Sequence, residues 1–278
     1  MLRHHFTVDV EEYFQVSAFE GLIPRSDWGR QESRIAASLA ALLELLAGVG
    51  ARGTFFVLGW VASRHPRLVR AISDAGHEIA AHGWDHRRVT DQGPKEFRDS
   101  VRRTRALLEQ MSGQPVEGFR APSYSIVPGY EWALDVLIEE GYRYDSSLFP
   151  IRRPGSRYGY PDAPVDPYWL QRPGGRLAEL PPAILPLAGC RIPAGGGAYF
   201  RLFPYALARA ALKACERRGV PGTFYIHPWE LDPGQPRFAV PWTTRIRHYG
   251  GLRRTRARLE QLLREFQFTA MADTVATL

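Results

Sequence analysis

The chain has 278 residues, of which 45% are hydrophobic and 23% are charged, a composition ordinary for a globular protein with one large core. No run approaches the roughly 20 apolar residues of a membrane-spanning helix, which excludes a transmembrane segment. The formal net charge is +7, carried almost wholly by arginine. The densest basic cluster, residues 245–258, is interleaved and continued by Leu252, Leu259, Leu262 and Leu263 at helical spacing. We interpret it as the solvated face of a helix and expect no nucleic-acid partner.

The first residues, Met-Leu-Arg-His-His-Phe, lack the apolar run and small-residue cleavage site of a secretory signal peptide. The two cysteines, Cys190 and Cys215, form no CxxC pair, and we expect both to be thiols. These observations predict a cytoplasmic protein. They do not indicate an oligomeric state.

Strand-like and helix-like segments alternate along the chain. We predict strands at 4–9, 53–58, 77–81, a short one ending at 120, 142–146, 222–227 and 266–271. We predict helices at 32–49, 66–75, 94–112, 129–140, 204–218 and 252–265. This rhythm indicates an α/β fold with a parallel sheet and helices outside it.

Residues 150–203 interrupt this alternation. The stretch is rich in Pro, Gly and Tyr, and we interpret it as an irregular insertion that shapes a cleft, with short strands near 177–181 and 189–193. A C-terminal extension covers about 235–278. No linker separates two domains, so we expect a single catalytic domain over 1–278.

Ionisable residues follow the predicted strands at their carboxyl ends. They are Asp9, Glu11, His82, His86, Arg120, Asp145 and His227. In a parallel α/β barrel these strand ends converge on one face, where active sites lie. The sequence therefore predicts one polar cluster on that face.

Two of these groups suit a metal ion. His82 and His86 have HxxxH spacing, and Asp9 and Glu11 are two residues apart, which places both carboxylates on one side of a regular strand. Two imidazoles and one carboxylate leave positions open for water and substrate, as in catalytic zinc sites. One carboxylate would then bind the metal, and the other would take a proton from the bound water.

Taken together, five motifs resemble those of the polysaccharide deacetylase (NodB-like, carbohydrate esterase family 4) family, in the same order. They are Thr7-Val-Asp-Val-Glu11, His82-Gly-Trp-Asp-His86, Arg120-Ala-Pro-Ser-Tyr124, Tyr144-Asp145 and Tyr225-Ile-His-Pro-Trp229. The segment from Asp9 to Gln15, the His-Pro-Trp-Glu ending and the tail from Arg247 to Leu252 are similar to a subgroup found with exopolysaccharide export and exosortase systems.

The resemblance implies a distorted, incomplete (β/α) barrel that hydrolyses N-acetyl groups of an amino-sugar glycan. Asp9 would be the general base, and Arg120 would hold it. His82, His86 and Glu11 would bind one divalent metal, most simply Zn²⁺. His227 would be the general acid, and Asp145 would tune it.

Three positions depart from the family pattern. Val10 replaces a metal-binding aspartate, so Glu11 must serve in its place. Gly83 removes a hydroxyl that braces the loop between the histidines. Ser123 precedes the aromatic Tyr124, so the backbone N–H of the oxyanion site could belong to either residue.

Aromatic residues suit the apolar faces of sugars, and we include Trp84, Tyr124 and Trp229 among the substrate-binding candidates. The expected partner is an acetylated amino-sugar glycan, with peripheral contact to a lipid-linked precursor left open. Three alternatives remain open. They are a hydrolase of small cyclic amides or ureides with the same fold, a non-haem iron enzyme, and an inactive glycan-binding protein.

Overall fold

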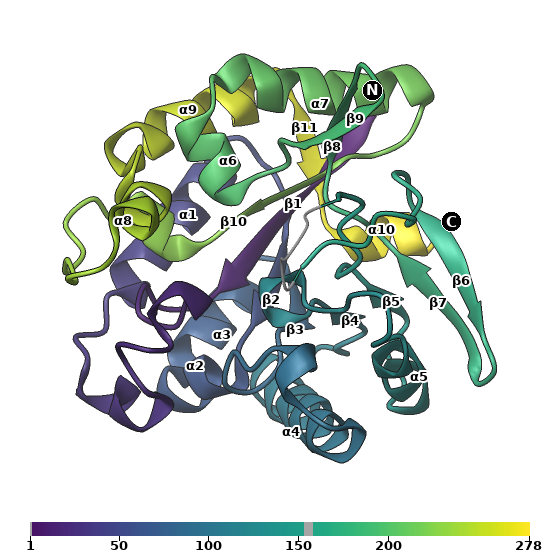
Figure 1. The fold of residues 1–278 in the computed structure, drawn as a ribbon, viewed down its shortest axis with the longest axis horizontal. Helices are drawn as coiled ribbons and strands as arrows, with labels where there is room; N and C mark the ends of the chain where they lie inside the picture. Colours follow the sequence, from purple (N-terminus) through teal and green to yellow (C-terminus); the bar gives the residue numbers. More distant parts are fainter. Residues whose placement is uncertain (1, 153–157) are drawn as a thin grey trace.

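The computed structural model describes residues 2–152 and 158–278 (Figure 1). Its strands are β1 (Arg3–Val10), β2 (Thr54–Val57), β3 (Glu78–Ala81), β4 (Gly118–Phe119), β5 (Tyr144–Asp145), β6 (Tyr168–Arg172), β7 (Gly175–Glu179), β8 (Ile184–Leu187), β9 (Cys190–Pro193), β10 (Thr223–Ile226) and β11 (Gln267–Thr269). Its α-helices are α1 (Ile35–Ala47), α2 (Gly59–Arg64), α3 (Pro66–Asp74), α4 (Pro94–Ser112), α5 (Trp132–Glu139), α6 (Gly197–Leu202), α7 (Tyr205–Arg218), α8 (Trp242–Tyr249), α9 (Leu252–Glu265) and α10 (Met271–Val275).

The main sheet has the order β10-β1-β2-β3-β4-β5-β7-β6, and β11 also pairs with β1. All its pairs are parallel except the β6–β7 hairpin. Single bridges, Pro182 to Thr223 and Gly196 to Tyr225, join the chain after β7 to β10. The strands therefore curve into a ring, with isolated bridges where a barrel would have a complete strand pair. The prediction of an α/β fold with a parallel sheet is confirmed.

Helices pack around the outside of this ring (Figure 1). The core between them and the sheet is apolar, because every residue of β2 and β3 and seven of the eight residues of β1 are buried. The longest helix, α4, ends at Gly113, whose left-handed conformation (φ 68°) terminates the helix without a Cβ penalty. Within the described ranges, no helix is long and apolar enough to cross a bilayer.

Residues 150–203 are more regular than predicted. The expected strands near 177–181 and 189–193 appear as β7 and β9, but β6, β8 and α6 were not predicted. Moreover, β7 pairs in parallel with β5, so this segment contributes to the main sheet itself. In the C-terminal extension, β11 pairs with the first residues of β1, and the short α8 and α10 were also not predicted.

Candidate active site

The carboxyl end of β1 carries a buried ion pair. The Arg120 guanidinium donates from Nη1 to Asp9 Oδ1 at 2.7 Å, and both side chains are almost fully buried. The same guanidinium donates to the hydroxyls of Thr7 at 2.8 Å and Ser146 at 2.9 Å. Burial lowers the pKa of Arg120, but the Asp9 carboxylate outweighs it and raises that pKa. Arg120 therefore fixes the orientation of Asp9, as the sequence predicted.

Glu11, His82 and His86 form a compact buried cluster. Each offers one ligand atom, and the three atoms lie within 4.8 Å of one another. Glu11 Oε2 lies 2.7 Å from His86 Nε2, yet the oxygen accepts no hydrogen bond of acceptable geometry. An orphaned buried acceptor is rare and needs a partner. The donor set and the orphaned oxygen fit a divalent cation held by Glu11, His82 and His86.

Neighbouring groups keep the His82 ring and the Glu11 carboxylate in the forms that bind a metal ion. His82 Nδ1 donates to the Arg120 carbonyl at 2.8 Å, because a carbonyl can only accept, and Nε2 keeps its lone pair. Burial lowers the pKa of His82 to about 4, so the ring is neutral near pH 7. Burial alone would raise the pKa of Glu11, but the facing His86 and His227 lower it to about 2.

His227 follows β10 and completes the site. Its Nε2 lies 3.8 Å from Asp9 Oδ2 and 3.7 Å from Glu11 Oε1. Its Nδ1 lies 2.7 Å from Glu230 Oε1, which also accepts from the His227 backbone N–H at 3.0 Å. Burial would lower the pKa of His227, but the carboxylates, Glu11 first, raise it to about 9. At neutral pH the His227 side chain is therefore the charged imidazolium, with a proton on each ring nitrogen.

Glu230 and Arg201 form a second buried ion pair behind His227. Arg201 also donates to the carbonyls of His248 at 3.0 Å and Arg247 at 2.9 Å. Burial raises the pKa of Glu230, but Arg201 and His227 outweigh it and lower the pKa to about 2. Neither residue was singled out from the sequence, although Glu230 stands three residues after His227 in the quoted ending.

Asp145 does not contact His227. Its carboxylate accepts from the Ser147 hydroxyl at 2.6 Å and the Ser147 N–H at 3.1 Å, and Ser147 in turn accepts from the Ala121 N–H at 2.8 Å. The prediction that Asp145 tunes His227 is therefore wrong, because the Asp145 carboxylate is bonded to Ser147 and not to the His227 ring. Glu230 occupies that place, because the turn after β10 brings it back onto the ring.

The loop after Arg120 has an unusual backbone. Ser123 (φ 56°) and Tyr124 (φ 53°) are consecutive residues in the left-handed region, as is His86 (φ 55°). The Tyr124 N–H donates to the Ala121 carbonyl at 2.9 Å. Because the Tyr124 N–H is already bonded, the Ser123 N–H is the remaining candidate for the oxyanion site. It lies in the first turn of a 3₁₀ helix, where N–H groups have no partner within the helix.

The two tryptophans pack as part of the structure. The Trp84 indole lies under the Arg103 guanidinium, which is 3.4 Å from the ring centroid, and packs against Gly59. Trp229 is 7% exposed, stacks between His227 (5.2 Å) and His248 (4.4 Å), and donates to Glu11 Oε1 at 3.2 Å. Trp229 therefore orients Glu11 and His227.

Two family models match this chain. Residues 31–142 match the polysaccharide deacetylase model, and residues 146–276 match a domain of unknown function, DUF3473. The first contains His82, His86 and Arg120, and the second contains His227, Glu230 and Arg201. Asp9 and Glu11 precede both. The site is thus assembled from three parts of the chain.

The chain is also similar to known proteins. It is 34% identical over 109 residues to a peptidoglycan deacetylase-like protein, FGM2, of Gibberella zeae, covering 38% of this chain and 31% of that protein. It is 26% identical over 112 residues to the peptidoglycan-N-acetylglucosamine deacetylase PgdA of Listeria monocytogenes, covering 37% and 23%. The chain thus spans less than a third of the length of these relatives.

A solved structure covers nearly the whole fold. A Mycobacterium smegmatis protein assigned to the polysaccharide deacetylases aligns with 99% of this chain and 90% of its own at a TM-score of 0.66, with 22% identity, which shows a shared fold. The family-model match over residues 31–142 and the relatives therefore show that this part of the chain is similar to the polysaccharide deacetylase (NodB-like, carbohydrate esterase family 4) family.

Proposed function

We propose that this chain is a metal-dependent hydrolase that removes N-acetyl groups from an amino-sugar glycan. The observation that carries the proposal is a single buried strand edge where His227 lies within 3.8 Å of Asp9 and 3.7 Å of Glu11, beside the His82–His86 pair. This set provides a base, an acid and a cation site at one point. The N-acetylglucosamine deacetylase named among the relatives supports the substrate class.

Glu11, His82 and His86 would hold the metal. Two imidazoles and one carboxylate favour Zn²⁺ among common divalent ions. When bound, such an ion polarises the acetamide carbonyl and lowers the pKa of water toward about 7. Val10 has no donor atom and points into the core, so Glu11 supplies the carboxylate ligand.

The remaining residues of this site move protons and hold charge. Asp9 takes a proton from the attacking water, and the Arg120 guanidinium holds that carboxylate in a fixed orientation. The Ser123 N–H is the candidate donor to the carbonyl oxygen as negative charge grows on it. His227, held protonated by Glu11 and Glu230, gives its proton to the leaving nitrogen. An amine is a poor leaving group without that proton.

We further propose that the substrate is an exopolysaccharide or its lipid-linked precursor at the cytoplasmic side of the membrane. The segment from Asp9 to Gln15 and the His-Pro-Trp-Glu ending support this assignment through their likeness to the exopolysaccharide-associated subgroup. Both cysteines are free thiols, which is compatible with a reducing compartment. Fractionation that recovers the native protein outside the inner membrane would contradict the location.

The first test joins metal content to activity. We expect the protein to bind about one equivalent of Zn²⁺ and to release acetate from chitin-type oligomers. His82→Ala should lose the metal and nearly all acetate release, because the two remaining protein ligands bind a divalent ion much more weakly than three do. His65→Ala, a histidine outside the cluster, is the matched control and should retain both. Full metal occupancy in His82→Ala would overturn the assignment.

A further inference from the structure

An apolar surface on α8 is left open to solvent. Trp242 is 73% exposed and Ile246 is 51% exposed. At the end of α6, Leu202 is 38% and Phe203 is 36% exposed. Half of the exposed large hydrophobic residues of the described chain thus lie on these two elements. Trp is seldom so exposed, and clustered apolar exposure marks an interaction surface.

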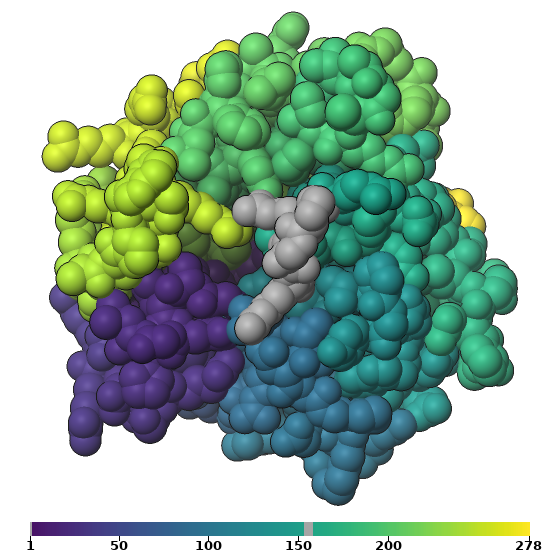
Figure 2. Space-filling view, in the orientation of Figure 1, coloured from purple at the N-terminus to yellow at the C-terminus, as the bar shows by residue number. Residues whose placement is uncertain are grey.

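The two elements, α6 and α8, are neighbours in space. Trp242 and Ile246 are four residues apart and lie on one face of α8. A Cβ built on Gly250, directly after α8, would lie 2.6 Å from the Leu202 side chain and 2.4 Å from the Ile246 carbonyl. Figure 2 shows the yellow-green chain around α8 beside the green chain of α6, on an outer side of the molecule. We call Leu202, Phe203, Trp242 and Ile246, with their flanking arginines, the α8 patch.

Along the chain, the charged residues on both sides of α8 are all basic over 233–259. Residues 233–259 contain seven arginines and no aspartate or glutamate. Arg245, Arg247 and Arg253 are exposed, and within residues 2–152 and 158–278 Arg245 and Arg253 have no carboxylate partner. Such a surface attracts a dense anionic partner. A second copy of this chain is disfavoured, because pairing two α8 patches would bring arginines against arginines.

We propose that the α8 patch docks this protein on an anionic membrane surface. Tryptophan prefers the membrane–water interface, and a short helix with apolar residues on one face and arginines at its edges lies in that interface. The arginines add electrostatic attraction to anionic headgroups. Because α8 has only eight residues, the docking is weak and reversible.

The opposite side of α8 reaches the candidate active site. His248 and Tyr249 are buried, and the His248 ring stacks on Trp229, which stacks on His227. The helix that meets the membrane is therefore two rings away from the candidate acid. If the proposed function holds, docking presents the site to glycan near the bilayer. The docking itself does not depend on that function.

Co-sedimentation with vesicles tests the proposal. The whole protein should sediment with vesicles of phosphatidylcholine mixed with phosphatidylglycerol, and much less with phosphatidylcholine alone. Added salt should weaken binding. Arg245→Gln and Arg253→Gln should each reduce the binding constant roughly five-fold. Trp242→Ser should reduce it by at least that factor.

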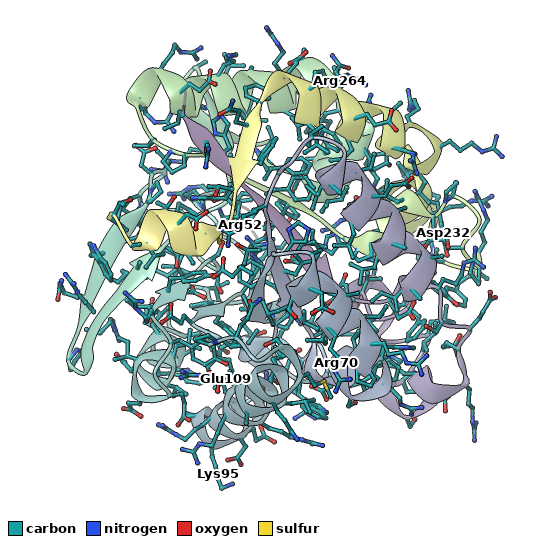
Figure 3. The ribbon with its side chains drawn as sticks, turned by 180° about the vertical axis from the view of Figure 1, so that it is seen from behind. Arg52, Arg70, Lys95, Glu109, Asp232 and Arg264 are labelled. Carbon is teal, nitrogen blue, oxygen red and sulfur yellow. The ribbon has the colours of Figure 1, made fainter. Side chains whose placement is uncertain are left out.

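Matched variants isolate the surface. Arg70→Gln, in α3 and labelled in the view from behind in Figure 3, removes the same charge elsewhere. Leu187→Ser removes another exposed apolar side chain, 55% exposed, on β8. Both controls should bind as the unaltered protein does. Equal losses in controls and patch variants, or equal binding to both vesicle types, would overturn the proposal. The proposal would also be overturned if the protein did not bind vesicles but self-associated with increasing concentration, and Trp242→Ser abolished that self-association. The vesicle assay contains neither metal nor glycan, so its outcome does not depend on whether the protein deacetylates a glycan.

Discussion

His227, which is partly exposed, differs from the fully buried histidines in its surroundings. The ring faces three carboxylates, those of Asp9, Glu11 and Glu230, whereas His5 is buried between two threonine hydroxyls. Glu230 holds the ring nitrogen and the backbone N–H of the same residue, and Arg201 fixes Glu230 from behind. His227 is therefore held in place by a buried chain of charges that runs from α6 to the end of β10. We assign Glu230 as a positioning residue.

Substitution of Glu230 should reveal that role through the leaving group. Glu230→Gln removes a charge and turns an amide N–H₂ toward Arg201. We expect a loss of acetamide hydrolysis approaching that of His227→Ala, on the order of 10²–10⁴-fold. Hydrolysis of an aryl acetate should fall much less in both variants, because its leaving group needs no proton. Steady-state rates on the two substrates check this.

Asp9→Asn provides the contrast, since water must be activated for either substrate and both rates should fall alike. Melting curves of the three variants show whether the fold persists. Equal losses on both substrates for Glu230→Gln, in a folded protein, would mean that Glu230 only supports the structure.

The sequence predicted which candidate residues lie together better than it predicted the residues that support them. Asp9, His82, Arg120 and His227 end buried strands, and parallel strands bring those ends to one edge, so pattern alone grouped them. Glu230 and Arg201 escaped because their pairing depends on where a turn and α6 lie in space. Asp145 was misassigned for the same reason: its nearest partner is Ser147, two residues away.

Among the elements, β10 is positioned by close backbone contact as well as by its strand pairs. Gly196 bridges to Tyr225, and a Cβ on Gly196 would lie 1.9 Å from the Tyr225 carbonyl oxygen. Its φ of 148° is also rarely open to other residues. Only glycine lets the chain before α6 approach β10, which carries His227 at its end.

Gly196→Ala should therefore destabilise the protein by about 3 kcal/mol, from steric overlap added to backbone strain. Gly76→Ala is the matched control, because Gly76 also has a positive φ (79°) but open space around its Cβ. It should cost about 1 kcal/mol. Urea unfolding of both variants measures the difference. Similar losses of unfolding free energy in the two variants would show that β10 can shift to accommodate the added methyl group.

Long, periodic elements were predictable and short ones were not. The predicted bounds of the helices at 94–112 and 252–265 match α4 and α9, because each has a continuous apolar stripe. By contrast, β6 has no fully buried residue, so its sequence shows no core-facing alternation. α8 has eight residues and an exposed apolar face. The basic cluster at 245–258, interpreted as the face of one helix, is divided between α8 and α9.

For the whole molecule, several buried histidines are neutral in the folded state. Burial lowers the pKa of His5 to about 3 and that of His248 to about 3, against an ordinary value near 6.5. Between about pH 3 and 6.5 the unfolded chain binds more protons at these positions than the folded protein does. The free energy of unfolding that they contribute therefore falls as pH falls through this window.

A variant at His5 should show this dependence. Between pH 6.5 and pH 5, the unaltered protein should lose about 1.5 kcal/mol more stability than His5→Gln, which cannot take up a proton. The difference between the two proteins matters, because buried acids with raised pKa values, such as Glu179, act in the opposite direction in both. Urea unfolding at the two pH values measures it, and parallel losses would contradict the assignment.

The pairing of β1 with β10 has a consequence for synthesis on the ribosome. His5 pairs with Thr223 and Val8 with Ile226, so β1 must wait for a strand that is made much later. Until then β1, whose side chains from His4 to Val10 are buried in the finished protein, has an open edge that can pair wrongly. Contacts this distant along the chain also form slowly. A nascent chain that ends before residue 227 has Asp9 without His227, so the candidate site is complete only after β10 has been made.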